Sequence, residues 1–468
     1  RDETIEIGAI LKLINDREYD KITIPNNCLD MAVQAVLHIL NTENLTFDEI
    51  FNYMRSISVY KSFTKEDLNL VINYLLAVDI DMNTVQGYEV TSWDSGYGDM
   101  GMAPDFDTLR LMPWHEKTAF VIADLVDHHH KGISVSPRQI LKAQLEKLEK
   151  AGLVALCGTE LEFIVFKDTY EEAWNKRYND LVPANQYNVD YSLTGTARVE
   201  KLLRAIRLGM DGADMIVESA KGECNFGQHE IAFRYQDALT TCDNHSIYKM
   251  GAKEIASEQG CSLTFMAKFN EREGNSCHIH LSFRDKKGAP ILSGDAGDGL
   301  SKEGRHYLAG IQKYMRELTL LFAPNINSYK RYQAGTFAPT AIKWGRDNRT
   351  CALRLVGEGQ SLRIENRVPG GDVNPYLAVA GMVAAGLSGI ENKLELEPIF
   401  QGNAYALETD RVPTSLKEAR DLWANSSWVR ETFGVEVQKH YTHMADTELD
   451  AFSRSVTDWE RFRSFERM

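Results

Sequence analysis

Residues 1–73 show the hydrophobic spacing of short amphipathic helices. Between residues 29 and 40, apolar side chains recur every three or four positions, which is the period of one helix face. Two Thr-x-x-acid pairs, beginning at Thr46 and Thr64, have the spacing of a capping box at a helix start. No cluster of metal ligands or nucleophiles occurs in this stretch. The pattern therefore predicts a small helical module over residues 1–73.

From residue 74 onward the pattern changes to short apolar–polar alternations separated by Gly and Pro, which is typical of strands and loops. Residues 118–124 are one strand candidate. Pro137 begins a predicted helix with apolar residues on one face, and strands then alternate with helices without any linker-like stretch or internal repeat. We predict an α+β chain with boundaries near residues 73 and 130, giving the ranges 1–73, 74–130 and 131–468.

Composition narrows the class of protein. Hydrophobic residues make up 43% of the 468 positions and charged residues 25%, as in a folded globular protein. The net charge of −15 disfavours nucleic-acid binding and favours an enzyme that handles cations. No apolar run is long enough to span a bilayer. The seven cysteines include no Cys-x-x-Cys pair, so we expect a cytoplasmic protein in a reducing compartment.

Two glutamates in the stretch GTELEF carry the first chemical signal. On a strand, Glu160 and Glu162 project from the same face because side chains alternate with a period of two. Apolar residues surround them, and two like charges against a buried layer are costly unless a cation lies between them. A solvated strand face is the alternative reading of this pair taken alone.

Further candidate ligands recur at similar short spacings. These residues are Glu223, Glu230, His278, His280 and Glu365. The His-x-His row alone could equally be a structural pair, but its occurrence together with the carboxylates weakens that alternative. Hard oxygen ligands with one imidazole suit Mg²⁺ or Mn²⁺ better than a structural zinc site.

A cluster of arginines complements the carboxylates. Its members are Arg331, Arg349, Arg354, Arg363 and Arg367. Guanidinium groups bind carboxylates and phosphates with two parallel hydrogen bonds. Phosphoryl transfer depends mainly on positioning and charge neutralisation, which a metal cluster facing arginines can supply. The chain has no Walker-type phosphate loop.

From about residue 74 to the end, the chain resembles the glutamine synthetase superfamily. The matching motifs are GTELEF, GECNFGQHE, GNSCHIHLS, NSYKR and LRIENRVPGGDVNPYLA. The resemblance implies a glutamine synthetase-type catalytic domain over residues 131–468, preceded by a partial β-grasp domain over 74–130. It also implies ATP- and Mg²⁺-dependent (or Mn²⁺-dependent) ligation of the glutamate γ-carboxylate to an amine through γ-glutamyl phosphate.

The resemblance also implies roles for individual residues. The ligands of the first metal, next to the glutamate γ-carboxylate, correspond to Glu162, Glu223 and Glu230. The ligands of the second metal, on the ATP phosphates, correspond to Glu160, His278 and Glu365. Glutamate-binding positions correspond to Arg331 and Gly274, and the γ-carboxylate contact to Arg367. The phosphate-stabilising and nucleotide-side positions correspond to Arg349, Arg354, Arg363, His280 and Ser282.

Two residues differ from the ammonia-using enzymes. Phe337, in Gly335–Pro339, stands where those enzymes have a glutamate that binds ammonium. Loss of that carboxylate removes both an attraction for a small cation and a proton acceptor, so the site resembles the γ-glutamylamide ligases that use polyamines, ethanolamine or alkylamines. Phe337 could instead only repack a flap. Glu273 replaces an asparagine and either attracts a cationic group or is a surface acid.

Residues 1–73 do not match the start of this family and resemble a segment of large superfamily-2 helicases. Ordinary glutamine synthetase and an inactive relative with an altered N-terminus therefore remain alternatives. For partners, we expect glutamate, a small amine and further copies of the chain in stacked rings, with twelve subunits as the expected number. We expect neither a membrane nor nucleic acid as a partner.

Overall fold

The computed structural model describes residues 47–57, 60–62, 64–65, 99–295 and 297–467. The chain divides into two compact units, residues 1–99 and 100–468. In the first unit, helix α3 (Phe47–Ser56) lies where the sequence predicts a helix after Thr46, and Ile50 and Met54 are buried. The predicted helix over 29–40 and all of residues 66–98 lie outside the described residues. The boundaries near 73 and 130 therefore stay predictions.

The second unit is built on a nine-stranded mixed sheet. Its main strand order is β4-β5-β3-β8-β11-β10-β9, with β6 and β7 also paired to β3. All neighbours are antiparallel except β9 and β10. The strands are β3 (Leu153–Phe166), β4 (Val217–Gly222), β5 (Gln228–Phe233), β6 (Gln236–Asp237), β7 (Ser262–Thr264), β8 (Cys277–Asp285), β9 (Trp344–Arg346), β10 (Leu353–Val356) and β11 (Arg363–Asn366).

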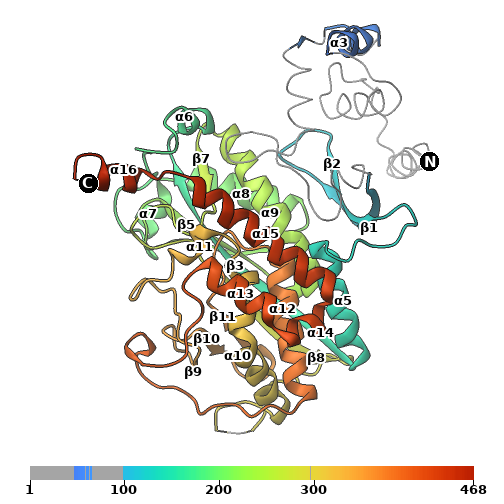
Figure 1. The fold of residues 1–468 in the computed structure, drawn as a ribbon, viewed down its shortest axis with the longest axis vertical. Coiled ribbons are helices and arrows are strands. Elements are labelled where there is room, and N and C mark those ends of the chain that lie inside the picture. The colour runs from blue at the N-terminus through green and yellow to red at the C-terminus, as the bar shows by residue number, and fades with distance from the viewer. Residues whose placement is uncertain (1–46, 58–59, 63, 66–98, 296, 468) are drawn as a thin grey trace. The chain divides into compact units, whose positions relative to one another are not determined.

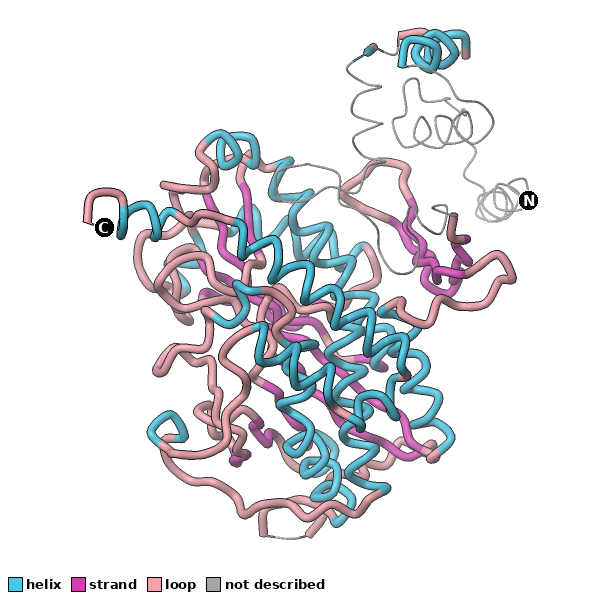
Figure 2. The backbone as a smooth tube through the Cα atoms, in the orientation of Figure 1, coloured by secondary structure: helices cyan, strands magenta, loops and turns pink. Residues whose placement is uncertain are grey.

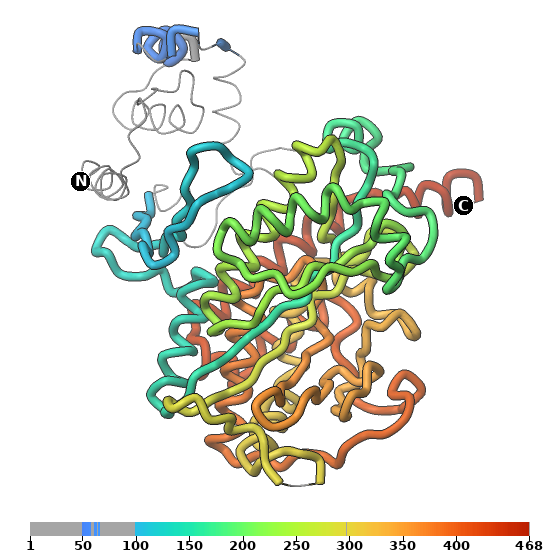
Figure 3. The backbone as a smooth tube through the Cα atoms, turned by 180° about the vertical axis from the view of Figure 1, so that it is seen from behind, coloured from blue at the N-terminus to red at the C-terminus, as the bar shows by residue number. Residues whose placement is uncertain are grey.

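Helices cover one face of this sheet. Figure 1 shows α12, α13 and α15 in front of the strands, and the reversed view in Figure 3 shows the long strand β3 (teal) from the other side. The helices are α5 (Pro137–Lys150), α6 (Tyr170–Asn175), α7 (Leu193–Ala197), α8 (Glu200–Gly212), α9 (Ala238–Glu258), α10 (Lys302–Phe322), α11 (Ile326–Tyr329), α12 (Pro375–Glu391), α13 (Leu416–Asn425), α14 (Ser427–Phe433), α15 (Val435–Arg454) and α16 (Asp458–Ser464), with 3-10 turns η3 (Gly359–Ser361) and η4 (Ala404–Ala406).

The core lies between the sheet and its helices. Alternate residues of β3, including Leu161, Phe163 and Val165, are fully buried there, so the intervening glutamates face the other side of the sheet. Helix α12 is apolar almost all round and nearly every residue of it is buried, as expected for a central helix. It packs closely on α10, and the lack of a side chain at Gly310 permits this approach. A Cβ on Gly310 would lie 2.1 Å from the carbonyl oxygen of Ala385.

A two-stranded antiparallel sheet precedes the large sheet in the second unit. It consists of β1 (Gly101–Leu111) and β2 (Ala119–Val126), and Figure 2 shows both strands in magenta. The predicted strand at 118–124 and the predicted helix after Pro137 are thus confirmed. The sheet is held by buried Arg138 on α5, which pairs with aspartates of β1, β2 and α9. The rest of the predicted β-grasp domain lies outside the described residues.

None of the helices in the described ranges is long and apolar enough to cross a membrane.

Candidate functional site

Strand β3 supplies one acidic residue to each of two ligand clusters. Glu160 lies directly opposite His278 on β8, and Glu162 lies directly opposite Glu230 on β5. Residues that are opposite each other across antiparallel strands have their side chains on the same face, about 5 Å apart at Cβ. The sheet register therefore sorts the predicted ligands into two groups on the face that points away from the helices.

The first group, here called the histidine set, consists of Glu160, His278 and Glu365. Oε2 of Glu160 lies 3.3 Å and Oε1 of Glu365 lies 3.5 Å from Nδ1 of His278. The candidate ligand atoms of the three residues all lie within 4.8 Å of one another. Three different strands, β3, β8 and β11, thus present two carboxylates and one imidazole to a single point.

Electrostatics keep the histidine set in the protonation state that a metal ligand requires. Burial, followed by the positive charge of Arg367, lowers the pKa of His278 to about 4, so the ring is neutral at neutral pH. Burial raises the pKa of Glu365, but the fields of His278 and Arg367 outweigh it and bring the pKa to about 2. A neutral imidazole beside ionised carboxylates is the donor set of a divalent cation.

The second group, here called the carboxylate set, consists of Glu162, Glu223 and Glu230. Their ligand oxygens also lie within 4.8 Å of one another. Burial and the charge of Glu223 raise the pKa of Glu162 to about 7, and burial together with Glu160 raises that of Glu230 well above its ordinary range. Three carboxylates held this close repel one another, so the set is built for a cation.

Hydrogen bonds from neighbouring backbone and side-chain groups orient the residues of the carboxylate set. Oε2 of Glu162 accepts a hydrogen bond of 2.7 Å from the backbone N–H of Ser276 and one of 3.1 Å from the side-chain amide of Gln228. Glu223 is placed by the turn between β4 and β5, where its N–H donates to the carbonyl of Gln228. The predicted turn that aims Glu223 and Glu230 at one point is therefore present.

Both sets fit divalent cations by their own chemistry. In the histidine set, the ring nitrogen beside both carboxylates is Nδ1 of the neutral His278, and a neutral imidazole nitrogen can serve as a metal ligand. In the carboxylate set, the ligand atoms are all carboxylate oxygens, which suit Mg²⁺ or Mn²⁺. The other ligands of each set lie outside β3: His278 on β8 and Glu365 on β11 for the histidine set, and Glu230 on β5 and Glu223 in the turn between β4 and β5 for the carboxylate set.

The arginines divide into paired and unpaired groups. Arg354 and Arg367 both form ion pairs with Glu365, and Arg354 also pairs with Asp347. Arg331 is 1% exposed and donates only to neutral acceptors, namely the Val368 and Arg367 carbonyls and the Ser276 hydroxyl.

Burial lowers the pKa of Arg331, and its Nε atom has no partner within the described part of the chain. A buried guanidinium that forms no ion pair with any described carboxylate is suited to bind an anionic ligand. Arg349, in contrast, lies exposed in the loop before β10.

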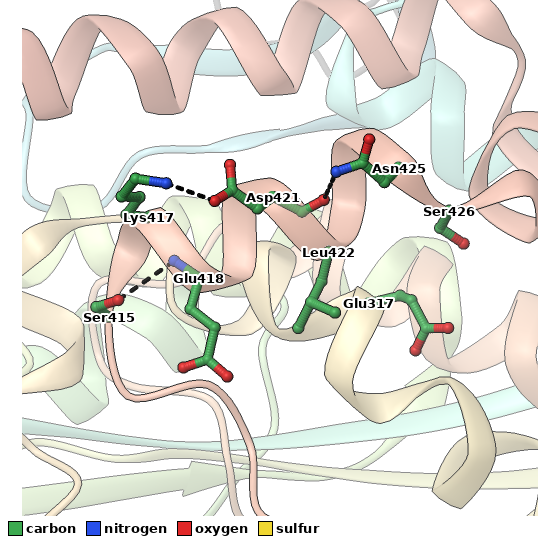
Figure 4. Close-up of a pocket in the computed structure, with 8 residues that line it drawn as sticks. All are labelled: Glu317, Ser415, Lys417, Glu418, Asp421, Leu422, Asn425 and Ser426. Atoms are coloured by element: carbon green, nitrogen blue, oxygen red, sulfur yellow. Dashed lines mark hydrogen bonds and ion pairs between the residues drawn. The ribbon is translucent and has the colours of Figure 1, made fainter.

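A pocket of about 410 Å³ adjoins the histidine set at Glu160. Glu160, His280, Ser282 and Arg363 line it, so the structure brings together three of the predicted nucleotide-side residues, whereas Arg349 and Arg354 are not among the residues that line it. Nε of Arg363 donates to Nδ1 of His280 over 3.1 Å. The larger pocket in Figure 4, along α13, contains none of the predicted residues.

The predicted substrate-binding loops show two local features. Gly274 allows a close backbone approach, because a Cβ there would lie 2.2 Å from the Ala267 carbonyl oxygen and 2.9 Å from Cγ of Arg331. Phe337 is 51% exposed and has a φ of 56°, which is strained for an aromatic residue. Glu273 is half-buried, and its carbonyl accepts a hydrogen bond from Asn225.

Sequence reasoning missed Lys221 and Gln228, which both contact the carboxylate set. Lys221 lies two residues before Glu223, so the same period-two spacing that marked Glu160 and Glu162 was available as a signal. Gln228 is part of the GQHE motif, but no spacing rule indicates that its amide would contact Glu162.

Comparisons with known proteins agree with this geometry. Residues 134–464 match the family model described as "Glutamine synthetase, catalytic domain". A γ-glutamylethanolamide synthetase of Streptomyces coelicolor is 62% identical over 396 residues, covering 85% of each chain. A glutamate–isopropylamine ligase of a Pseudomonas species is 36% identical, covering 84% of this chain and 87% of that protein.

A glutamine synthetase of Thermotoga maritima is 30% identical, covering 92% of this chain and 98% of that protein. Among solved structures, the GmaS/ADP complex superimposes with a TM-score of 0.73 at 27% identity, over 79% of this chain and 86% of that chain. GmaS without ligand gives a TM-score of 0.72 at the same identity and coverage.

Proposed function

The chain belongs to the glutamine synthetase family and is a glutamate–amine ligase, and we propose that its amine is ethanolamine or a similarly small alkylamine. The observation that carries this proposal is the 62% identity with the Streptomyces coelicolor protein, which is named for ethanolamine. The Pseudomonas relative, named for isopropylamine, also uses an amine larger than ammonia.

Phe337 supports the same substrate class. The ammonia-using enzymes of the family have a carboxylate at the position that corresponds to Phe337. An aromatic ring offers neither a negative charge nor a proton acceptor. A partly exposed ring in a strained backbone conformation can contact the carbon atoms of an alkylamine. Glu273 would then be a second specificity residue at the edge of the glutamate site.

We propose that the two ligand sets hold divalent cations, Mg²⁺ or Mn²⁺, in different positions. The histidine set adjoins the 410 Å³ pocket, which would take the nucleotide, with His280, Ser282 and Arg363 around it. The carboxylate set would lie beside the glutamate γ-carboxylate, with Arg331 and Gly274 on the glutamate backbone. The cations neutralise phosphate and carboxylate charge, which lets two anions approach each other.

The reaction proposed has two balanced steps. An oxygen of the glutamate γ-carboxylate attacks the γ-phosphorus of ATP, and the bond from phosphorus to the ADP oxygen breaks. The amine nitrogen then attacks the γ-carbonyl carbon, inorganic phosphate leaves with the bridging oxygen, and the nitrogen loses one proton. Arg349, Arg354 and Arg367 would stabilise the charge on the transferring phosphoryl group and on the departing phosphate.

Phosphate release from ATP with glutamate and Mg²⁺ tests the amine, with product masses as confirmation. We expect release with ethanolamine at low concentration and little release with ammonium, putrescine or spermidine. Equally fast phosphate release with ammonium alone would identify the protein as an ordinary glutamine synthetase. Glu160→Gln is the control variant, because it removes a predicted ligand of the nucleotide-side cation and should abolish release with every amine.

The remaining predictions concern organisation. We propose that residues 1–73, 74–130 and 131–468 are a helical module, a partial β-grasp domain and the catalytic domain. We also propose a homo-oligomer of stacked rings with twelve subunits, as the family resemblance implies. Light scattering after size-exclusion chromatography measures the subunit number, and a monomeric, active enzyme would contradict the ring assembly.

A further inference from the structure

One lysine contacts the carboxylate set directly. Nζ of Lys221 lies 2.5 Å from Oε1 of Glu223 and 3.3 Å from Oε1 of Glu230. Within the described part of the chain, no other cationic side chain comes within 4 Å of a carboxylate oxygen of this set. The ammonium group thus contacts two of the three residues whose oxygens form the candidate cation site.

The register of the sheet fixes the position of Lys221. Lys221 on β4 lies directly opposite Glu230 on β5, so the two side chains share one face of the sheet. Its side chain is 25% exposed, whereas that of Glu230 is 2% exposed. Lys221 is thus the more exposed partner of this pair, and its side chain lies between the buried set and the surface.

We infer that Lys221 is an internal counter-cation of the carboxylate set, which stabilises the metal-free site and must withdraw when a divalent cation binds. This inference rests on the proposed metal role of that set. Three clustered carboxylates repel one another when they are ionised, and the ammonium group of Lys221 offsets that repulsion in the metal-free site. A divalent cation bound to the same oxygens would repel that ammonium group at short range.

The aromatic ring of Tyr191 offers a place for the displaced group. Nζ of Lys221 already lies 5.1 Å from the centroid of that ring, within the range of a cation–π contact. The long lysine stem lets the ammonium group move toward the ring and solvent without moving β4. Lys221 is therefore a positioning residue that sets the affinity of the carboxylate set for its cation.

Titration of the full chain with Mn²⁺ tests the inference. The electron paramagnetic resonance signal of free Mn²⁺ measures how much of the ion remains unbound. Lys221→Met removes the charge and keeps most of the side-chain volume. Because it removes a like charge beside the cation, we expect it to bind one Mn²⁺ about tenfold more tightly than the wild type, and to melt at a lower temperature only when metal-free. Lys221→Arg keeps the charge and should behave like the wild type. Unchanged or weaker Mn²⁺ binding by Lys221→Met overturns the inference.

Lys343→Met is the matched control. Lys343 also forms an ion pair with a glutamate, Glu397, at a side-chain exposure of 21%, but it contacts neither ligand set. Its replacement should leave Mn²⁺ affinity unchanged. If both methionine variants tighten binding equally, the effect is one of net charge and the inference fails.

Two further measurements separate this inference from the proposed function. Glu230→Gln should lose one bound Mn²⁺; if it loses none, the metal role of the set and the inference both fail. If it loses one but Lys221→Met binds normally, only the inference fails.

In the wild type, Mn²⁺ should speed reductive methylation of Lys221 and not of Lys343, as read by mass spectrometry. Equal rates with and without Mn²⁺ would contradict displacement even if Lys221→Met does not fold.

Discussion

Glu365 lies directly opposite Arg354 in the pairing of β11 with β10, and its Oε2 accepts a hydrogen bond of 2.8 Å from Nη1 of Arg354. The Glu365 side chain is 1% exposed, and its other oxygen pairs with the buried Arg367. The carboxylate of this predicted metal ligand thus pairs with Arg354, a predicted phosphate-stabilising arginine, and with Arg367, the predicted contact of the glutamate γ-carboxylate.

Replacing Glu365 should therefore destabilise the protein as well as inactivate it. Glu365→Gln keeps the side-chain shape but leaves two guanidinium groups without their carboxylate, and breaking a buried ion pair in this way costs about 3 kcal/mol. Urea unfolding without metal measures the loss. Glu358→Gln is the control, since Glu358 pairs with Arg346 but is 87% exposed, and its change should stay below about 1 kcal/mol. Equal urea midpoints for the two variants would contradict a stabilising role for the pairing of Glu365 with the two arginines.

Phe337→Glu should shift the amine preference toward ammonium. The new carboxylate restores an attraction for a small cation, and we expect the ratio of kcat/KM for ammonium to that for ethanolamine to rise on the order of tenfold. Competition between the two amines, read as product masses, measures this ratio directly. Gln333→Glu adds the same charge to an exposed position nearby and should leave the ratio unchanged. A matching rise in both variants would assign the effect to surface charge.

Gly274→Ala should weaken glutamate binding and lower stability together. The Ala267 carbonyl oxygen is held by the N–H of Asn275, so it cannot move away from a Cβ placed 2.2 Å from it. Overpacking of this kind costs about 1–3 kcal/mol, and the shift of Arg331 should raise the KM for glutamate more than that for ATP. Gly297→Ala, where a Cβ would meet no atom within 4 Å, is the control. An unchanged glutamate KM would remove Gly274 from the proposed glutamate site.

Buried histidines should make the fold sensitive to acid. Burial lowers the pKa of His229 to about 4 and that of His245 to about 3, from an ordinary 6.5. Between pH 6.5 and 4 the unfolded chain binds a proton at each ring but the folded chain does not, so the free energy of unfolding falls as pH falls. The expected slope is about 1.4 kcal/mol per pH unit for each histidine.

Urea midpoints between pH 7 and pH 4.5 test this dependence. His245→Asn should show a shallower loss of stability than the wild type, whatever its stability at pH 7. His128→Asn, in an exposed loop, should follow the wild-type slope. Parallel curves for all three proteins would show that His245 is protonated as easily in the folded chain as in the unfolded chain.

Local patterns in the sequence predicted some of this site correctly. The alternation in GTELEF placed Glu160 and Glu162 on one strand face, because a period of two depends only on the strand itself. The helix after Pro137 and the strand near residues 118–124 were equally local. The grouping of ligands into two sets came from the family resemblance, and the structure forms the same two groups through the register of β3 with β5 and β8.

Other features could not be predicted from one sequence. The contact of Lys221 with Glu230 depends on the pairing of β4 with β5, which no spacing rule gives. The left-handed backbone of Phe337 depends on the loop around it. That Arg331 bonds to neutral acceptors and not to a carboxylate among the described residues shows only when its surroundings are known, because a sequence cannot tell an arginine in an ion pair from one without an ion pair.

The central strand carries a constraint on how this protein can change over generations. Every residue of β3 from Leu153 to Leu161 pairs with β8, and Glu160 to Ile164 also pair with β5. One inserted or deleted residue would turn both glutamates into the core and bring Leu161 to the opposite face. A substitution in β3 changes one side chain at a time, but a change in its length would displace ligands of both sets at once. The length of this strand is thus as much a part of the site as the side chains that it carries.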